Sequence, residues 1–235
     1  MKLESWVAQI EASLRAAASR SRSSHDGAYA GTDLEFLGVQ TAEWRTLVHR
    51  LDGELPASWE ECARALWKSP VFEARAMALE LAARHQREFA KPHWSLFSGW
   101  LKESVGWAMI DGLCDAVIAP MLVRYPELVQ KTRAWVRSRN VWLRRASLVV
   151  FCRTVRNQLY SDEAFEHAAA LLADRNPMIT KAVSWILRAL IKHYPKRVQS
   201  FLRQHESEIA PAALREVRLK LTTGTKSGRQ RKGEK

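Results

Sequence analysis

The stretch that decides the fold is residues 106–123, GWAMIDGLCDAVIAPMLV, in which apolar residues recur with the period of an α-helix. It belongs to an internal repeat marked by large apolar residues 35, 35 and 36 positions apart, namely Phe72, Trp107, Trp142 and Met178. Four residues after each marker, three repeats have alanine and one has a carboxylate, in the order Ala76, Asp111, Ala146 and Ala182. A repeat of this length is typical of stacked helix pairs.

Asp111 is the exception in this pattern. An unpaired buried carboxylate is costly, so the residue either has a structural partner or acts on a cationic ligand. One position before the alanine, the other three repeats carry a cation: Arg75, Arg145 and Lys181. Three positions after it, the last repeat has Trp185 in place of a smaller side chain. Because stacked repeats bring equivalent positions side by side, we expect a basic groove with Asp111 at its centre between Trp107 and Trp185.

Helical periodicity extends over almost the whole chain, and capping or proline signals such as Ser58 with Glu61, and Pro195, mark helix starts. The expected helices span 3–18, 41–52, 58–68, 70–85, 92–103, 106–123, 126–137, 139–157, 162–173, 176–193, 195–206 and 210–221. The sequence therefore predicts an all-α, HEAT-like solenoid of about six helix pairs with a concave basic groove. We expect residues 1–221 to form a single domain, residues 19–33 to be irregular, and residues 222–235 to be a basic, disordered tail.

The protein has 37 lysines and arginines but 25 acidic residues, which gives a net charge of +12. This excess of positive charge favours a polyanionic partner. The three cysteines, Cys62, Cys114 and Cys152, are far apart in apolar patterns and indicate reduced core thiols. No run of apolar residues approaches transmembrane length, and the first residues lack a signal peptide's apolar core. We expect a cytoplasmic protein associated with the nucleoid. No histidine or cysteine spacing indicates a metal site.

The chain resembles the AlkD-type DNA glycosylases, which are HEAT-like repeat enzymes of DNA alkylation repair. The resemblance extends from about Tyr29 to about Leu219. Its motifs are FLGVQTAEWRTLV at 36–48, GWAMID at 106–111, YPELV at 125–129, NVWLRRAS at 140–147 and KAVSWILR at 181–188. These segments, in this order and at these separations, are much more specific than any one of them alone.

The resemblance implies roles for individual residues. Trp107 and Asp111 match the catalytic tryptophan and aspartate of the family, and Trp185 matches its second tryptophan. Arg145 matches a groove arginine, and Tyr29 an aromatic residue near the DNA. The other DNA contacts that we expect come from three further basic residues: Arg144, Lys181 and Arg75. Departures from the family pattern occur at Ala108, Pro177 and Met178.

The implied activity is excision of positively charged alkylpurines, such as 3-methyladenine and 7-methylguanine, from duplex DNA. It would be carried out by a monomer without a cofactor and without a pocket for a flipped base. Two other classes stay open: a helical-repeat protein that binds DNA without chemistry, and a protein-binding scaffold. Arg145 has an alternative as well, because it would make a structural ion pair if it met Asp111. Steep salt dependence of duplex binding would favour the DNA-binding classes.

Overall fold

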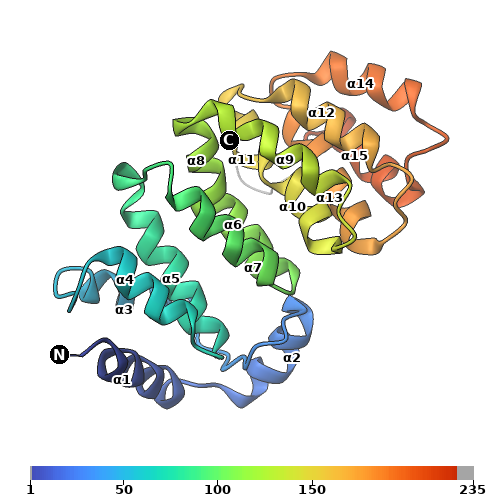
Figure 1. Ribbon diagram of the computed structural model, residues 1–235. Helices are drawn as coiled ribbons and strands as arrows, with labels where there is room; N and C mark the ends of the chain where they lie inside the picture. Colours follow the sequence, from blue (N-terminus) through green and yellow to red (C-terminus); the bar gives the residue numbers. More distant parts are fainter. Residues whose placement is uncertain (1, 227–235) are drawn as a thin grey trace, which may run out of the picture. The chain divides into compact units, whose positions relative to one another are not determined.

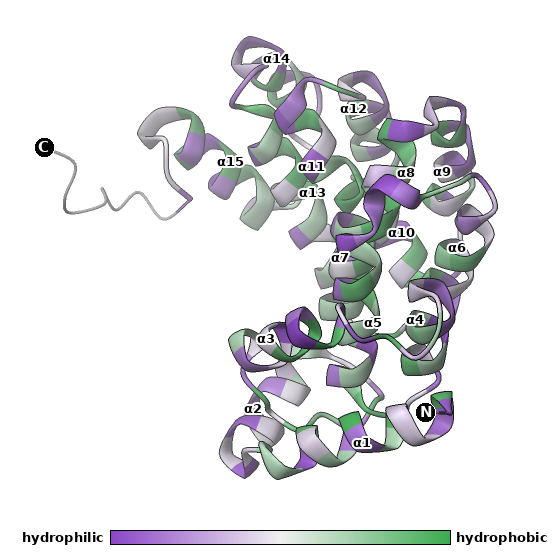
Figure 2. Ribbon diagram, turned by 90° about the vertical axis from the view of Figure 1, so that its left-hand side faces the viewer, coloured by the Kyte–Doolittle hydropathy of each residue, from purple (hydrophilic) through white to green (hydrophobic). Residues whose placement is uncertain are grey.

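The computed structural model describes residues 2–226, and helices follow one another along most of that range (Figure 1). Within these residues, strand-like pairing is limited to an isolated bridge between Glu35 and Val71. Figure 2 shows polar and apolar residues mixed along the helices, as expected where one face of a helix packs and the other meets solvent. The predicted all-α class is confirmed.

The first half of the chain contains α1 (Leu3–Ala16), α2 (Arg20–Ala30), α3 (Thr41–Leu51), α4 (Trp59–Trp67), α5 (Phe72–Arg84), α6 (His93–Glu103), α7 (Trp107–Leu113) and α8 (Ala119–Arg124). The second half contains α9 (Val129–Val136), α10 (Val141–Val149), α11 (Phe151–Thr154), α12 (Ser161–Ala170), α13 (Pro177–Leu190), α14 (Pro195–Gln204) and α15 (Pro211–Thr223). Short 3₁₀ turns occupy Gln86–Glu88, Pro126–Leu128 and Val155–Asn157, and a π-helical turn occupies Cys114–Ile118.

The chain forms two compact units, one ending at Met121 and the other beginning at Leu122. In the first unit α4 packs on α5, α6 packs on α7, and α5 also contacts α3 and α7. In the second unit α9 packs on α10 and α12 packs on α13, which contacts both α10 and α15. Within each unit, helices therefore pair with a neighbour in sequence, and the second helix of one pair contacts that of the next.

The repeat found in the sequence corresponds to the starts of equivalent helices. Helices α5 and α7 begin at Phe72 and Trp107, while Trp142 and Met178 are the second residues of α10 and α13. Two of the repeat alanines, Ala146 and Ala182, are completely buried. Ala76 is only partly buried, and so is Asp111.

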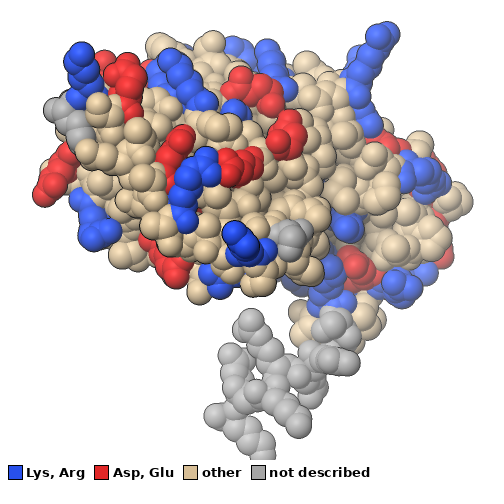
Figure 3. Space-filling view, turned by 90° about the horizontal axis from the view of Figure 1, so that it is seen from below, with Lys and Arg blue, Asp and Glu red and all other residues tan. Residues whose placement is uncertain are grey.

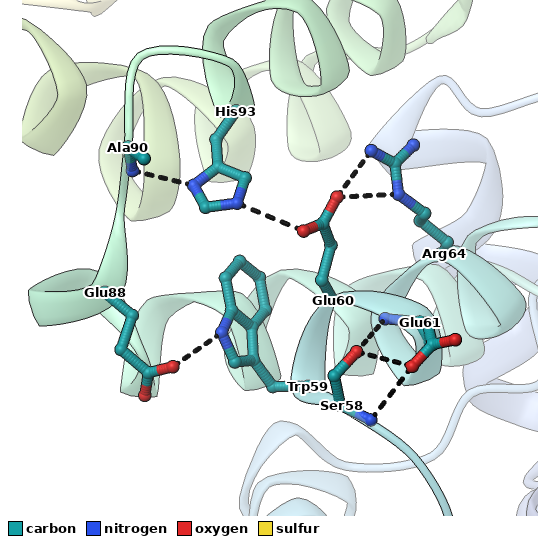
Figure 4. A network of polar contacts seen from close by, with 8 residues as sticks. All are labelled: Ser58, Trp59, Glu60, Glu61, Arg64, Glu88, Ala90 and His93. Atoms are coloured by element: carbon teal, nitrogen blue, oxygen red, sulfur yellow. Dashed lines mark hydrogen bonds and ion pairs between the residues drawn. The ribbon is translucent and has the colours of Figure 1, made fainter.

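Helix starts show why the boundaries were predictable. Ser58 caps α4 by accepting the amide of Glu61, whose carboxylate accepts the Ser58 amide in return (Figure 4). Asn140 and Asn176 cap α10 and α13, each accepting from the amide two residues later at 2.8 and 2.9 Å. These two asparagines hold equivalent repeat positions, so the same local chemistry starts both helices.

The prediction of an irregular segment at 19–33 is wrong, because Arg20–Ala30 form helix α2. Its serines and glycine are poor helix formers and it has little apolar surface, so local sequence gives a weak signal. Contacts from outside the segment hold it: the Ser19 amide donates to the Leu37 carbonyl at 3.0 Å, and the Arg22 guanidinium donates to the Gly38 carbonyl at 2.8 Å. Tertiary contacts therefore override propensity here.

Two long predicted helices are interrupted, and the last one runs further than predicted. The segment 106–123 is interrupted by the π-helical turn at Cys114–Ile118, and 139–157 is divided into α10, α11 and a 3₁₀ turn. Helix α15 reaches Thr223, two residues into the predicted tail, and ends at Gly224 with φ 73°. Within that tail, residues 227–235 lie outside the described residues.

A buried carboxylate joins α5 to the loop before α3. Glu73 is 1% exposed, and it accepts hydrogen bonds from the amides of Leu37, Gly38 and Val39 at 3.1, 2.7 and 3.2 Å. Successive amides of this kind form a cradle for a negative charge. Gly38 has φ 75°, and a Cβ there would lie 2.7 Å from the Ser19 carbonyl, so the turn requires glycine.

Candidate functional site

Helix α7 presents Trp107 and Asp111 one turn apart, and both side chains are partly exposed. The helix is preceded by Gly106, which has φ 92° and touches the end of α2. A Cβ at Gly106 would lie 2.6 Å from the Gly31 carbonyl oxygen and 2.7 Å from that of Ala30. Only glycine allows this approach, which fixes the end of α2 beside the first turn of α7.

Tyr29, on that last turn of α2, lies against Trp107. The two rings meet edge to face with centroids 5.1 Å apart, and the indole Nε1 donates a hydrogen bond to the Tyr29 carbonyl. Tyr29 is 68% exposed, the highest value among the large apolar side chains that the structure describes. An exposed tyrosine paired with a partly exposed tryptophan forms an aromatic surface open to a ligand.

The π-helical turn follows directly after α7. It occupies Cys114–Ile118, and α8 follows it directly and ends at Arg124. Turns of this kind are energetically unfavourable and frequently occur at functional sites. Here the turn comes one residue after Leu113, the last residue of α7, so Asp111 lies in the last regular turn before the change in helical pitch.

In the second unit, Arg145 is 5% exposed on α10. Its Nη1 donates to the Met178 carbonyl at 2.7 Å, which connects α10 to the first turn of α13. Lys181 and Trp185 lie one turn apart on α13; the lysine is exposed and the tryptophan is partly exposed. On this helix, an accessible cation and an accessible aromatic ring therefore stand next to each other.

Two other arginines expected to bind DNA are used in contacts within their own units. Arg144 pairs with Asp174 at 2.7 Å and donates to the Ser138 carbonyl, also at 2.7 Å, so it braces the start of α10. Arg75 lies over the ring of Trp67, 5.3 Å from its centroid, and donates to the Ser69 carbonyl at 2.9 Å. A role for either in DNA binding stays a prediction.

Of the predicted residues, the structure brings Tyr29 and Trp107 into contact and places Asp111 one turn along the same helix. Sequence reasoning missed the buried Glu73, because a single glutamate on a helix gives no signal of burial. Lysine and arginine side chains are interspersed with acidic ones on the face drawn in Figure 3. The predicted basic groove stays a prediction.

Neither a membrane span nor a metal site was found in the part of the chain that the structure describes. No helix there has the length and hydropathy needed to cross a bilayer. No three side chains among its histidines, cysteines, aspartates and glutamates are grouped so as to hold a metal ion.

Comparisons with known proteins identify one family and a shared fold. The model of the DNA alkylation repair enzyme family matches residues 10–221. A solved structure described as a predicted DNA alkylation repair enzyme from Enterococcus faecalis aligns with a TM-score of 0.72 at 16% identity, covering 85% of this chain and 94% of its own. AlkD2 from Streptococcus mutans aligns with a TM-score of 0.63 at 18% identity, covering 94% and 98% of the two chains. At such identities the likeness shows a shared helical-repeat fold. No curated protein sequence matches the chain.

Proposed function

The chain belongs to the DNA alkylation repair enzyme family, and from that membership we propose that it is a DNA glycosylase for cationic N3- and N7-alkylpurines. Its substrates would be 3-methyladenine and 7-methylguanine in duplex DNA, and the reaction would hydrolyse the N-glycosidic bond. The observation that carries the proposal is the arrangement on α7, where a carboxylate lies one turn from an accessible indole beside an exposed tyrosine.

The chemistry needs little from the protein beyond charge placement. Alkylation at N3 or N7 makes the purine a cation, so it leaves without first being protonated. The barrier then lies mainly in forming a sugar with oxocarbenium character, and a carboxylate close to that sugar stabilises the developing positive charge. We assign this role to Asp111, which also has the acceptor needed to orient the attacking water.

The aromatic residues complement the carboxylate. The indole face of Trp107 attracts a positively charged sugar by the same quadrupole effect that operates in cation–π contacts. The ring is held in place by its hydrogen bond to the Tyr29 carbonyl and by the edge of the Tyr29 ring. We propose the same stacking role for Trp185 in the second unit.

DNA binding would rest on exposed cations. Lys181 is exposed and is our first candidate for a phosphate contact. Arg145 is nearly buried and holds the Met178 carbonyl, so we propose that its main contribution is to position α13, with a phosphate contact from any accessible part of its guanidinium. The net charge of +12 supplies the long-range attraction to DNA.

The test is release of free base from duplex DNA. Purified protein is incubated with a duplex carrying 7-methylguanine and with the same duplex carrying guanine, and released bases are quantified by chromatography. We expect 7-methylguanine to be released and guanine to be retained. Salt-sensitive duplex binding without release of 7-methylguanine or 3-methyladenine would contradict the proposal and would favour a non-catalytic DNA-binding protein.

A further inference from the structure

A series of contacts in the first unit runs from α5 through α2 to the candidate catalytic surface. It begins at Glu73, on the first turn of α5, and ends at Trp107, on the first turn of α7. Glu73 is 1% exposed, and the proposed chemistry gives it no role. A buried carboxylate is costly, so its place in the fold depends on the groups that it holds. Those groups connect it to α2.

The carboxylate of Glu73 fixes the loop before α3. Its Oε1 accepts the amides of Gly38 and Val39 at 2.7 and 3.2 Å, and its Oε2 accepts the amide of Leu37 at 3.1 Å. The three donors use both oxygens. A glutamine side chain cannot replace the carboxylate, because its NH₂ group would face one of the backbone donors. Bonds to a charged acceptor are also roughly twice as strong as bonds to a neutral one.

The same loop holds the start of α2. The Leu37 carbonyl accepts the Ser19 amide at 3.0 Å, and the Gly38 carbonyl accepts from the Arg22 guanidinium at 2.8 Å. Leu37 and Gly38 therefore each donate to Glu73 and accept from α2. Helix α2 has 11 residues, among them three serines and a glycine, and so short a helix of this composition depends on such outside contacts.

The middle of α2 rests on the same support. A Cβ at Gly27 would lie 3.0 Å from the Cβ of Phe36, so helix and loop pack closely there. The Phe36 ring is 4.9 Å from the ring of Phe72, the neighbour of Glu73 on α5. The Phe72 amide also donates to the Glu35 carbonyl at 2.9 Å. The segment from Glu35 to Val39 thus forms a layer between α2 and the start of α5.

The far end of α2 orients Trp107. The Tyr29 carbonyl accepts from the indole Nε1, and the two rings meet edge to face with centroids 5.1 Å apart. Trp107 is only partly buried, so these contacts with α2 contribute much of what fixes its side chain. In Figure 1 the end of α2 lies beside the start of α7. A shift of α2 would therefore move the indole.

We propose that Glu73 is a positioning residue for the reaction: through the loop at Leu37–Val39 it holds α2 where Tyr29 and Trp107 form the candidate catalytic surface. The inference rests on the proposed function, because the reaction is the base excision assigned to α7. Neutralising Glu73 should loosen the loop, and α2 should then leave its place against α7 before the rest of the unit unfolds.

The experiment observes Trp107 directly by ¹⁹F NMR. The full chain is labelled with 5-fluorotryptophan, and the Trp107 resonance is assigned by its absence from Trp107→Phe. In Glu73→Gln we expect this resonance to move by more than its linewidth, while the resonance of Trp135 in the second unit, assigned in the same way, stays in place. A Trp107 resonance at its wild-type position in folded Glu73→Gln would overturn the inference.

Two variants separate positioning from general loss of stability. Ser58→Ala removes the capping box of α4 in the same unit, so it destabilises the fold without touching α2, and it should leave the Trp107 resonance in place. An equal shift in Ser58→Ala would overturn the inference. If circular dichroism shows that Glu73→Gln does not fold, Arg22→Met decides, because it breaks the next link in the series and leaves the buried carboxylate paired. It should move the Trp107 resonance, and an unmoved one would overturn the inference.

Single-turnover release of 7-methylguanine relates this position to the reaction. The rate should be roughly 10- to 100-fold lower in Glu73→Gln and unchanged in Ser58→Ala, because small displacements at a reacting centre have effects of this size. A resonance that moves without loss of rate would overturn the role in the reaction. If the wild type itself releases no base, the proposed function falls, and the Trp107 resonance still decides whether Glu73 holds α2 and the indole in place.

Discussion

Gly106→Ala tests the contact that holds α2 against α7. The wild-type residue has φ 92°, and an added Cβ would lie 2.6 and 2.7 Å from the carbonyl oxygens of Gly31 and Ala30. The backbone strain of a non-glycine residue there costs about 1–3 kcal/mol. Displacing two backbone carbonyls costs about 1–3 kcal/mol more, as for other overpacked sites. We expect the free energy of unfolding to fall by roughly 2–6 kcal/mol.

The assay is urea unfolding followed by circular dichroism, with Gly99→Ala as the control. Gly99 is inside α6, and a Cβ there meets nothing within 4 Å, so alanine should stabilise the helix by about 0.5–1 kcal/mol. Hydrogen exchange gives a local readout, because amides of α2 should lose protection first in the Gly106 variant. The reasoning is refuted if Gly106→Ala unfolds at the wild-type urea concentration and keeps the protection of α2.

Three further predictions use other parts of the structure. Glu73→Gln should lower the free energy of unfolding by roughly 2–4 kcal/mol in urea titrations, because a charged acceptor of three amides becomes neutral; an unchanged midpoint would contradict this. Partial burial lowers the pKa of His85, but its hydrogen bonds with Glu88 and Asp52 outweigh this effect and raise the pKa above the usual value. The stabilisation of the fold by protonated His85 should therefore be complete below about pH 6.5 and be lost as the pH rises through the raised pKa. The melting temperatures of wild type and His85→Gln should then converge towards alkaline pH. A difference in melting temperature that grows with pH would be inconsistent with this. Lys181→Ala should reduce the slope of log affinity for duplex DNA against log salt by about 0.9 and leave stability within about 0.5 kcal/mol; an identical slope would show that Lys181 contacts no phosphate.

Local chemistry made much of the fold predictable. Apolar periodicity located most helices, and Ser58 and Pro195 marked starts that the structure has at or next to those positions. The 35-residue repeat identifies equivalent helices from the sequence alone, because the residue that begins a packed helix recurs when the same pair of helices is repeated. Asn140 and Asn176 carry the same capping signal, each two residues before a repeat marker.

What escaped prediction depends on contacts between distant segments. Helix α2 is stabilised by partners at Leu37 and Gly38, which lie outside its own sequence. Burial of Glu73 depends on a cradle of amides that forms only after folding. The π-helical turn after α7 has no marker comparable to a cap or a proline.

The candidate site was predictable to a similar degree. The resemblance identified Trp107 and Asp111, and the repeat placed them on one face of a helix. Neither indicated that Trp107 lines a hollow together with residues of α2, α3 and α5, because the packing of these helices is set by tertiary contacts. The near-complete burial of Arg145 was equally hidden, since arginine is usually exposed and its partner, the Met178 carbonyl, is a backbone group.

The most direct test of the account is the single-turnover rate of 7-methylguanine release by Asp111→Asn, with duplex binding measured in parallel. Asp162→Asn, which neutralises an exposed carboxylate in the second unit, is the control. We predict that Asp111→Asn binds the duplex as the wild type does but releases base roughly 100- to 1000-fold more slowly, because charge is lost where the transition state needs it. A rate for Asp111→Asn equal to those of the wild type and Asp162→Asn would contradict the assignment of Asp111 to the chemistry.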